Sequence, residues 1–269
     1  MKIPTFIVDA FTNQPFRGNT AGVCLLEQPV SPAQMQQIAA ELKHSETAFI
    51  AMHPDPEGQL GIRYFTPTTE VEFCGHATLA SAKVILENRH HPAVKFLTHF
   101  GLALSARPVP DGIQMHFPLY DTEPFDIKPE TLAALGLTAT VQIRFAKALD
   151  MLLVEVANQQ TLKNIQPDFK RLQLSDHRIK ELAVTTRSQD SDFDFYSRCF
   201  CPWLGIDEDP VTGAIHTVLA KYWCDKLGKK QLKAFQLSER GGYLNLHVLP
   251  GGLEVTSNAH IVMEGTINL

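Results

Sequence analysis

At 269 residues, the chain is long enough to bury the core of one large domain or of two smaller ones. Its formal net charge is −5, and its basic residues are scattered among acidic ones, which argues against the basic stripe that a nucleic-acid partner requires. The longest apolar runs, such as residues 149–157, contain charged residues and fall short of the roughly 20 residues that a membrane helix needs. We therefore expect neither a nucleic-acid partner nor a membrane span.

The cysteines and the first residues indicate a reducing compartment. Five cysteines form an odd set without a spaced framework, so we expect free thiols. Residues 1–9 are typical of a strand and lack the cleavage site of a secretory signal, which predicts a cytoplasmic protein. Cys199, Cys201, Cys224 and His216 could be drawn as zinc ligands, but no second Cys-x-x-Cys or His-x₃-His pair accompanies them. We predict no metal site.

Short β-rich runs recur along the whole chain and are mostly joined by short connections. The predicted strands cover residues 3–8, 21–26, 47–51, 61–65, 94–98, 112–117, 151–156, 182–186, 193–198, 243–248, 252–256 and 260–263. Between the second and third of them, Ser31, Pro32 and Gln34 form the capping box and first turn of a helix. The pattern favours an α+β fold rich in strands.

Two further helices are predicted over residues 75–86 and 212–227, the second ended by Gly228. Both are apolar on more than one face, so each is expected to be the central helix of a curved sheet. Each begins at a glycine where a strand-like stretch ends. The unpaired N–H groups of a helix start, with a glycine among them, let a carboxylate approach the backbone, so we interpret the pair as two anion-binding helix ends at one cleft.

The middle of the chain separates two similar halves. Residues 118–129 are acidic, contain proline and lack a periodic pattern, and we interpret them as a linker. This divides the chain into domains at 1–117 and 118–269. Alternatively, the C-terminus contributes a strand that closes the sheet of the first domain. Aligning the two helix-starting glycines places Cys74 opposite Thr212, but aligning the His-containing motifs shifts the register by two, so the repeat alone is only suggestive.

Glu46 is the first candidate for chemistry. It lies at the start of an apolar strand, directly after the first helix. Burial there would favour the neutral acid and raise its pKa above about 4.3, which suits a group that both accepts and returns a proton. On the pattern alone, an exposed glutamate at a strand edge is the more common arrangement.

Four polar residues near the helix starts have both a structural and a functional interpretation. Asp209 is either a helix cap or an acceptor for an imidazole or a substrate ammonium, and His76 is either structural or a donor to a substrate oxygen. Asn19 follows a turn glycine and could hold a substrate carboxylate. Cys74, beside a helix start, is either a buried filler or a reactive thiol, but Thr212 in the glycine-aligned position disfavours a racemase with two thiols.

Together these motifs resemble the PhzF family of phenazine biosynthesis proteins, within the diaminopimelate epimerase-like fold. The matching segments are Asp-Ala-Phe-Thr at 9–12, Pro-Phe-Arg-Gly-Asn-Thr-Ala at 15–21, Ser-Glu-Thr-Ala-Phe at 45–49, Arg-Tyr-Phe-Thr-Pro at 63–67, Cys-Gly-His-Ala-Thr at 74–78 and Gly-Ile-Asp-Glu-Asp-Pro-Val-Thr-Gly at 205–213. They occur in the family's order across most of the chain. The resemblance implies two pseudo-symmetric domains, each a curved mixed sheet around a central helix, and a homodimer.

The resemblance also implies a cofactor-independent isomerase that moves a proton between carbons. Residue by residue, it gives Glu46 the role of acid/base and makes His76 and Asp209 its polar partners. The substrate-binding positions that we expect are Asn19, Cys74, Gly75, Gly213 and Ala214. Ala214, where many members have serine, and Ile215, where alanine is usual, depart from the family pattern, and loss of a buried hydroxyl is enough to alter substrate choice.

We therefore expect an isomerase or epimerase that acts on a small carboxylate-bearing metabolite. Two alternatives remain at this point. One is a metabolite-binding or protein-interaction module on the same fold without turnover, and the other is a racemase that uses Cys74 opposite Glu46.

Overall fold

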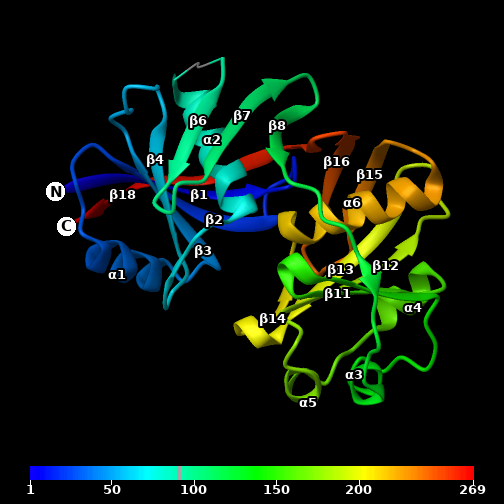
Figure 1. The fold of residues 1–269 in the computed structure, drawn as a ribbon. Helices are drawn as coiled ribbons and strands as arrows, with labels where there is room; N and C mark the ends of the chain where they lie inside the picture. Colours follow the sequence, from blue (N-terminus) through cyan, green and yellow to red (C-terminus); the bar gives the residue numbers. More distant parts are fainter. Residues whose placement is uncertain (90–91) are drawn as a thin grey trace. The chain divides into compact units, whose positions relative to one another are not determined.

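The computed structural model describes residues 1–89 and 92–269, and the chain divides into two compact units (Figure 1). Unit 1 consists of Met1–His116 with Glu254–Leu269, and unit 2 is Phe117–Leu253. The second unit thus ends at Leu253 rather than at residue 269, because the last 16 residues belong to unit 1. Each unit is a curved, mainly antiparallel sheet with a long helix on one face, which confirms the α+β architecture of two similar halves.

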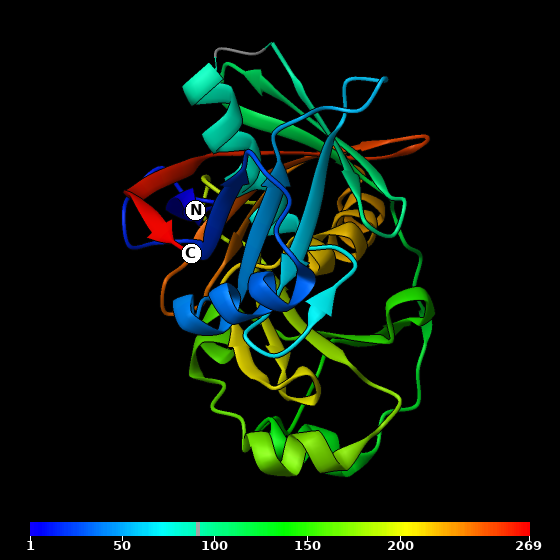
Figure 2. The ribbon, with the colours of Figure 1, turned by 90° about the vertical axis from the view of Figure 1, so that its left-hand side faces the viewer.

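Unit 1 closes its sheet with the two ends of the chain. β1 (Lys2–Ala10) pairs antiparallel with β18 (Ala259–Asn268) on one side and with β2 (Asn19–Leu26) on the other, and Figure 2 shows the red β18 alongside the blue β1. β2 pairs parallel with the next strand of the sheet, β3. The remaining elements of this unit are α1 (Pro32–Leu42), β3 (Glu46–Ala51), β4 (Leu60–Phe65), β5 (Glu70–Val71), α2 (Gly75–Arg89), β6 (Val94–Thr98), β7 (Ala103–Val109), β8 (Gly112–Phe117) and β17 (Gly252–Ser257), which pairs with β8.

Unit 2 repeats this arrangement. β11 pairs parallel with β12, and β13 pairs with β12, β14 and β15. Its elements are β9 (Glu123–Pro124), α3 (Pro129–Ala134), β10 (Gln142–Ala146), the 3₁₀ turn Lys147–Leu149, β11 (Met151–Glu155), α4 (Gln159–Asn164), α5 (Phe169–Ser175), β12 (Glu181–Arg187), β13 (Phe195–Cys201), the 3₁₀ turn Pro202–Leu204, β14 (Ile206–Asp209), α6 (Gly213–Leu227), β15 (Gln231–Gln236) and β16 (Gly242–Leu249).

The two glycine-started helices are largely buried, as their apolar sequences predict. On α2, residues that point in every direction are inaccessible, among them Leu79, Ala82, Val84 and Ile85, and on α6 the same holds for Ile215, Val218, Leu219 and Trp223. The opposite face of each sheet carries shorter helices. In unit 1, α1 packs there against Phe49 and Phe65, and in unit 2 the apolar side chains of α3, α4 and α5 form a second core with β10–β13.

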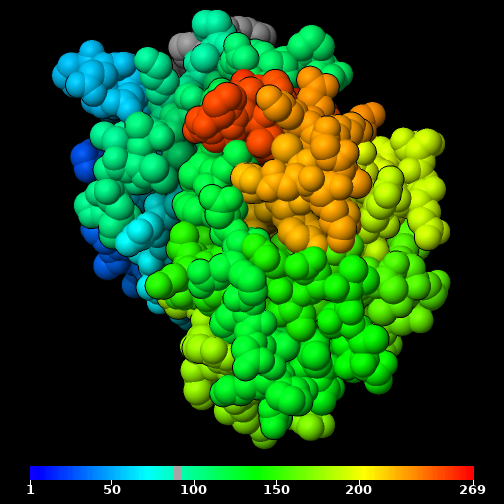
Figure 3. All heavy atoms as spheres, turned by 45° about the vertical axis from the view of Figure 1, so that its right-hand side comes forward, coloured from blue at the N-terminus to red at the C-terminus, as the bar shows by residue number. Residues whose placement is uncertain are grey.

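The predicted linker is wrong, because residues 118–129 are integrated into unit 2. The Tyr120 N–H donates to the Thr217 carbonyl of α6 at 3.2 Å, and β9 pairs with β10. Figure 3 shows this green segment against the orange α6. The segment lacks a periodic pattern because only two of its residues form a strand.

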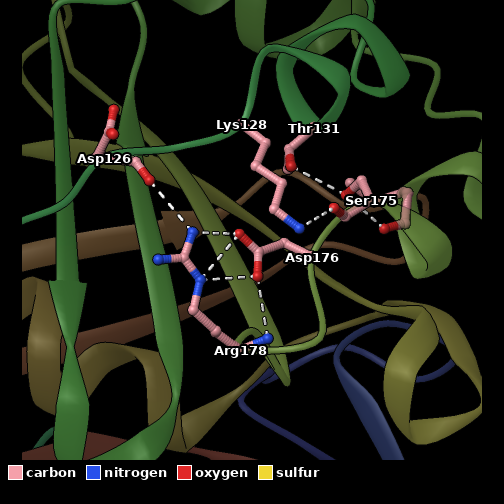
Figure 4. A network of polar contacts seen from close by, with 7 residues as sticks. Asp126, Lys128, Thr131, Ser175, Asp176 and Arg178 are labelled. Carbon is pink, nitrogen blue, oxygen red and sulfur yellow. Dashed lines mark hydrogen bonds and ion pairs between the residues drawn. The ribbon is translucent and has the colours of Figure 1, made fainter.

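A charged network holds the end of this segment against the chain before β12 (Figure 4). The buried Asp176 accepts from Arg178 Nε at 2.9 Å, and Arg178 Nη2 reaches the Asp126 carbonyl at 3.2 Å. The Lys128 ammonium donates to the Ser175 carbonyl at 3.2 Å. The network therefore fixes the path of the chain into the first residue of β12, Glu181.

Unit 1 contains a tight turn that requires glycine. Gly18 has φ +67°, and a Cβ there would lie 2.0 Å from the Ala10 carbonyl oxygen. Gly58 has φ +77°, but a Cβ there would meet nothing within 4 Å. The two glycines share a left-handed backbone and differ in the space around them.

We expect Gly58→Ala to lower the free energy of unfolding by about 1–2 kcal/mol, the ordinary cost of a left-handed residue with a Cβ. Gly18→Ala should cost at least twice as much, because the Ala10 backbone must also move. Urea unfolding of both variants measures the difference. Equal losses would contradict the close contact at Gly18.

Candidate active site

Glu46 is the first residue of β3 and lies opposite Ala21 of the parallel neighbour β2. The chain reaches it from α1 through Lys43, whose left-handed backbone (φ 55°) ends the helix, and then through Ser45. Only 15% of the Glu46 side chain is exposed. The carboxylate is therefore largely buried at the start of an apolar strand, whereas the sequence pattern alone favoured an exposed glutamate.

The imidazole of His76 faces Glu46. His76 is the second residue of α2, and 6% of its side chain is exposed. Its Nε2 lies 3.3 Å from Glu46 Oε2 and 3.3 Å from Ser45 Oγ. Its Nδ1 lies 3.2 Å from the amide nitrogen of Asn19, which is a donor. Nδ1 therefore accepts, and the neutral ring carries its proton on Nε2, directed at the Glu46 carboxylate.

The Asn19 side chain is placed by the loop between β1 and β2. Asp9 at the end of β1 accepts from the Phe16 N–H at 2.7 Å and from the Thr20 hydroxyl at 2.6 Å. These contacts fold the loop over Gly18 and leave Asn19 buried as the first residue of β2. Asn19 is thus a fixed partner of His76 as well as a candidate substrate-binding residue.

Cys74 joins the same cluster from the start of α2. Its Sγ lies 3.3 Å from His76 Nδ1, and 7% of the residue is exposed. Its carbonyl accepts from the Thr78 N–H at 3.0 Å and from the Thr78 hydroxyl at 2.7 Å, which begins the helix at Gly75. Glu46, His76, Cys74, Gly75 and Asn19 are therefore brought together in unit 1.

Burial raises the pKa of Glu46 above its ordinary value of 4.5, while hydrogen bonds from Ser45 and Cys74 oppose the shift. Desolvation is the larger effect because the carboxylate has left water at the start of a strand that is otherwise apolar. A carboxyl group with a raised pKa is a stronger base once ionised. The site therefore has the electrostatics of a group that can both take up and return a proton.

Three ligand atoms of this cluster could also receive a metal ion. Within residues 1–89 and 92–269, the group of three or more such side chains is Glu46, Cys74 and His76, whose ligand atoms lie within 4.8 Å of one another. A carboxylate, a thiolate and an imidazole are all zinc ligands. The set considered from the sequence, around Cys199 and His216, is not such a group, and each of the five cysteines has a free thiol.

The predicted residues of unit 2 form a second cluster. Asp209 ends β14, and its carboxylate accepts from the Thr212 hydroxyl. The fully buried Gln236 bridges the turn: its side-chain oxygen accepts from the Thr212 N–H at 2.9 Å, and its amide donates to the Asp209 carbonyl at 2.7 Å. Gln236 was missed from the sequence because an amide on a strand of alternating pattern gives no signal of this role.

Gly213 and Ala214 are the first two residues of α6. Gly213 is buried, and Ala214 is half-buried and brings only a methyl group to the helix start. One turn later, His216 is bound through Nδ1 to the Thr212 carbonyl at 2.7 Å, and burial lowers its pKa to about 4. His216 is therefore a neutral part of the core.

The chain has an epimerase-like fold. A predicted epimerase from Pseudomonas aeruginosa superposes with a TM-score of 0.74 at 20% identity (98% of this chain and 99% of that one). A probable proline racemase from Agrobacterium radiobacter gives 0.65 at 10% identity (99% and 93%). At these identities the likeness concerns the fold alone.

A family model described as "Phenazine biosynthesis-like protein" (PhzC-PhzF) matches residues 8–266. Phenazine biosynthesis-like domain-containing protein 2 of Mus musculus is 40% identical over 99% of each chain, and an uncharacterized isomerase of Halalkalibacterium halodurans is 41% identical over 91% of each. The crystal structure of a PhzF family protein from Enterococcus faecalis has a TM-score of 0.91 at 34% identity and covers 100% of both chains. The chain belongs to the phenazine biosynthesis-like PhzF family, as its motifs predict.

Within the described residues, every helix is too short or too polar to cross a bilayer.

We expect Glu46→Gln to raise the melting temperature at pH 8 and to leave it almost unchanged at pH 4. The folded state holds the Glu46 proton more tightly than the unfolded state, so the associated stability is present below pH 4.5 and lost as the pH rises through the raised pKa. Thermal unfolding followed by circular dichroism across this range measures the effect.

Glu70 of β5 is the matched control with the opposite sign. Arg63 binds it through two hydrogen bonds of 2.7 and 2.6 Å and lowers its pKa, so its contribution is present above pH 4.5 and lost as the pH falls. Glu70→Gln should therefore destabilise the protein at pH 7. A change of the melting temperature in the same direction for both variants would contradict the desolvation of Glu46.

Proposed function

We propose that the protein is a cofactor-independent isomerase or epimerase that moves a proton between carbons of a small carboxylate-bearing metabolite, with Glu46 as the general acid/base. The observation that carries the proposal is the buried Glu46 carboxylate, 3.3 Å from His76 Nε2, with its pKa raised by desolvation. Membership of a family with relatives named as isomerases supports the reaction class. Asp209 is proposed as a further polar partner of the substrate.

The chemistry follows from the protonation states in the cluster. Ionised Glu46 takes a proton from a carbon next to an electron-withdrawing group, so the C–H bond breaks, an O–H bond forms and the electron pair is delocalised in the substrate. The Nε2–H of His76 stabilises the carboxylate before transfer. The neutral acid then returns the proton to a neighbouring carbon or to the opposite face of the same one.

The proposed substrate-binding groups are suited to an anionic substrate. Gly75 and Gly213 begin helices of 15 residues, and helix starts favour a carboxylate. Asn19 and Cys74 contribute side chains beside His76. Ala214 offers no hydroxyl at the second helix start, so the phenazine substrate is not proposed for this protein. A homodimer stays a prediction that rests on the resemblance.

Incubation with a pool of small carboxylic metabolites in heavy water tests the proposal. We expect wild-type protein to incorporate deuterium at carbon in one of them, with or without a metal chelator, as mass spectrometry detects. Glu46→Gln should slow this exchange by at least about 100-fold, the usual contribution of a general base. Glu41→Gln, on the exposed face of α1, is the matched control and should exchange like wild type.

Exchange that survives in Glu46→Gln would refute the role of Glu46. A metabolite that raises the melting temperature but never exchanges would instead support a binding module on the same fold.

A racemase that uses Cys74 is the second candidate, because the thiol lies 3.3 Å from His76 Nδ1, within reach of a base. We expect Cys74→Ser to keep exchange within about tenfold of wild type, because Glu46 and His76 remain in place. The measurement is the same exchange assay with the metabolite that the wild type labels. A loss as large as that of Glu46→Gln would favour the racemase.

A further inference from the structure

The two units carry corresponding residues before and at the starts of their central helices. In unit 1, Arg63 of β4 donates two hydrogen bonds to Glu70 of β5, and its guanidinium lies over the Phe65 ring. In unit 2, Arg198 of β13 donates two hydrogen bonds of 2.8 Å to Glu208 of β14.

The Arg198 guanidinium lies over the Phe200 ring in the same way. Each central helix begins five residues after the glutamate that the arginine binds, at Gly75 and at Gly213. The structure therefore supports the alignment of Gly75 with Gly213 rather than the alignment of the two His-containing motifs.

This correspondence identifies Glu181 as the counterpart of Glu46. Arg63 pairs with Phe49, three residues after Glu46, and Arg198 pairs with Val184, three residues after Glu181. Each of the two glutamates is the first residue of its strand, opposite the parallel neighbour: Ala21 for Glu46 and Met151 for Glu181.

The partner of the carboxylate differs between the two units. His76 is the residue after the helix-starting glycine in unit 1, and its counterpart in unit 2 is Ala214. A methyl group replaces the imidazole. In agreement with this, Glu181 Oε2 is buried and has no hydrogen-bond partner within the described part of the chain. A buried carboxylate without a donor is costly, whereas the neutral acid is tolerated.

Glu181 shares one face of the sheet with Asp209. Ala183, Cys199 and Asp209 are register partners across β12, β13 and β14, and Glu181 lies two residues from Ala183, so it projects to the same side. This face lies under α6, because Trp223 of that helix donates to Thr185 Oγ1 at 3.0 Å. Burial, with the charge of Asp209 as a further cause, raises the pKa of Glu181 to about 7.

The other ionisable groups around Glu181 do not neutralise it. From β13, the Cys199 thiol stays protonated because its pKa is raised by Cys201 and by burial, and the Cys201 thiol lies beside it. On α6 the buried His216 is neutral. Lys180, next to Glu181 in sequence, is bound to Asp150 at 2.8 Å.

We propose that Glu181 is a positioning residue for Asp209: it holds a proton beside the Asp209 carboxylate, so that this face of unit 2 carries one negative charge instead of two. The role rests on the proposed function, in which Asp209 receives part of the substrate. Ionisation of Glu181 adds a second charge that repels a carboxylate substrate. The consequence is a KM that rises with pH, with a smaller effect on kcat.

The first experiment needs no substrate. In protein labelled with ¹³C at the glutamate side-chain carboxyl, we expect one resonance to titrate near pH 7. It should be absent from Glu181→Gln and should titrate at lower pH in Asp209→Asn, because the charge beside it is gone. A titration midpoint of the Glu181 resonance near pH 4.5, or one that does not change in Asp209→Asn, would overturn the proposal even if the exchange reaction itself is never found.

The second experiment uses the metabolite that the wild type labels. We expect its KM to rise by about tenfold between pH 6 and 8.5, in line with the repulsion of two charges near a protein surface. The KM of Glu181→Gln, a mimic of the neutral acid, should stay level over this range. Glu130→Gln, exposed on α3, is the matched control and should keep the wild-type profile. Identical profiles for wild type and Glu181→Gln would overturn the positioning role and leave the proposed function intact.

Discussion

The withdrawal of the Glu46 carboxylate from water is the constraint on which the arrangement of unit 1 depends. An unpaired buried charge would be expensive, and the fold offsets this cost with the imidazole at the start of α2 and with hydrogen bonds from Ser45 and Cys74. The Asn19 amide donates to the other nitrogen of the imidazole and so favours the tautomer whose proton faces the carboxylate. Asn19 in turn depends on the Asp9 loop, so a chain of local contacts runs from β1 to the carboxylate.

The central helices make this arrangement rigid. Residues 75–82 of α2 are all buried, so the start of this helix cannot shift without moving the sheet around it. Tyr64 of β4 adds a direct tie, because its hydroxyl lies 2.7 Å from Thr78 Oγ1, which is itself bound to the Cys74 carbonyl. A group that must meet a carbon atom at bonding distance benefits from such a support.

Much of this could be predicted from the sequence, because capping and apolar patterning are local. The Ser31 capping box and both central helices followed from short motifs, whereas the pattern around Glu46 favoured an exposed side chain and only the family resemblance gave that residue a role. The strand 103–109 was missed because most of its residues are exposed, so it lacks the alternation of a half-buried strand. The short helices α3, α4 and α5 were missed because tertiary packing stabilises them, and six or seven residues carry too little helical signal.

The site was only partly predictable for a similar reason. Distances between His76, Glu46 and Asn19 depend on strand register, which no local motif encodes. Glu181 did carry a readable signal, because Glu-Leu-Ala-Val at residues 181–184 places an acid before an apolar strand, as Glu-Thr-Ala-Phe does at 46–49. Its significance emerges only when the Arg63 and Arg198 pairs align the two units.

The pairing of β1 with β18 has a consequence for biosynthesis. β1 leaves the ribosome before unit 2 and cannot pair with β18 until β18 has been translated, whereas unit 2 is continuous in sequence and lies between the two strands. Unit 2 can therefore fold on the nascent chain while this edge of β1 is still open.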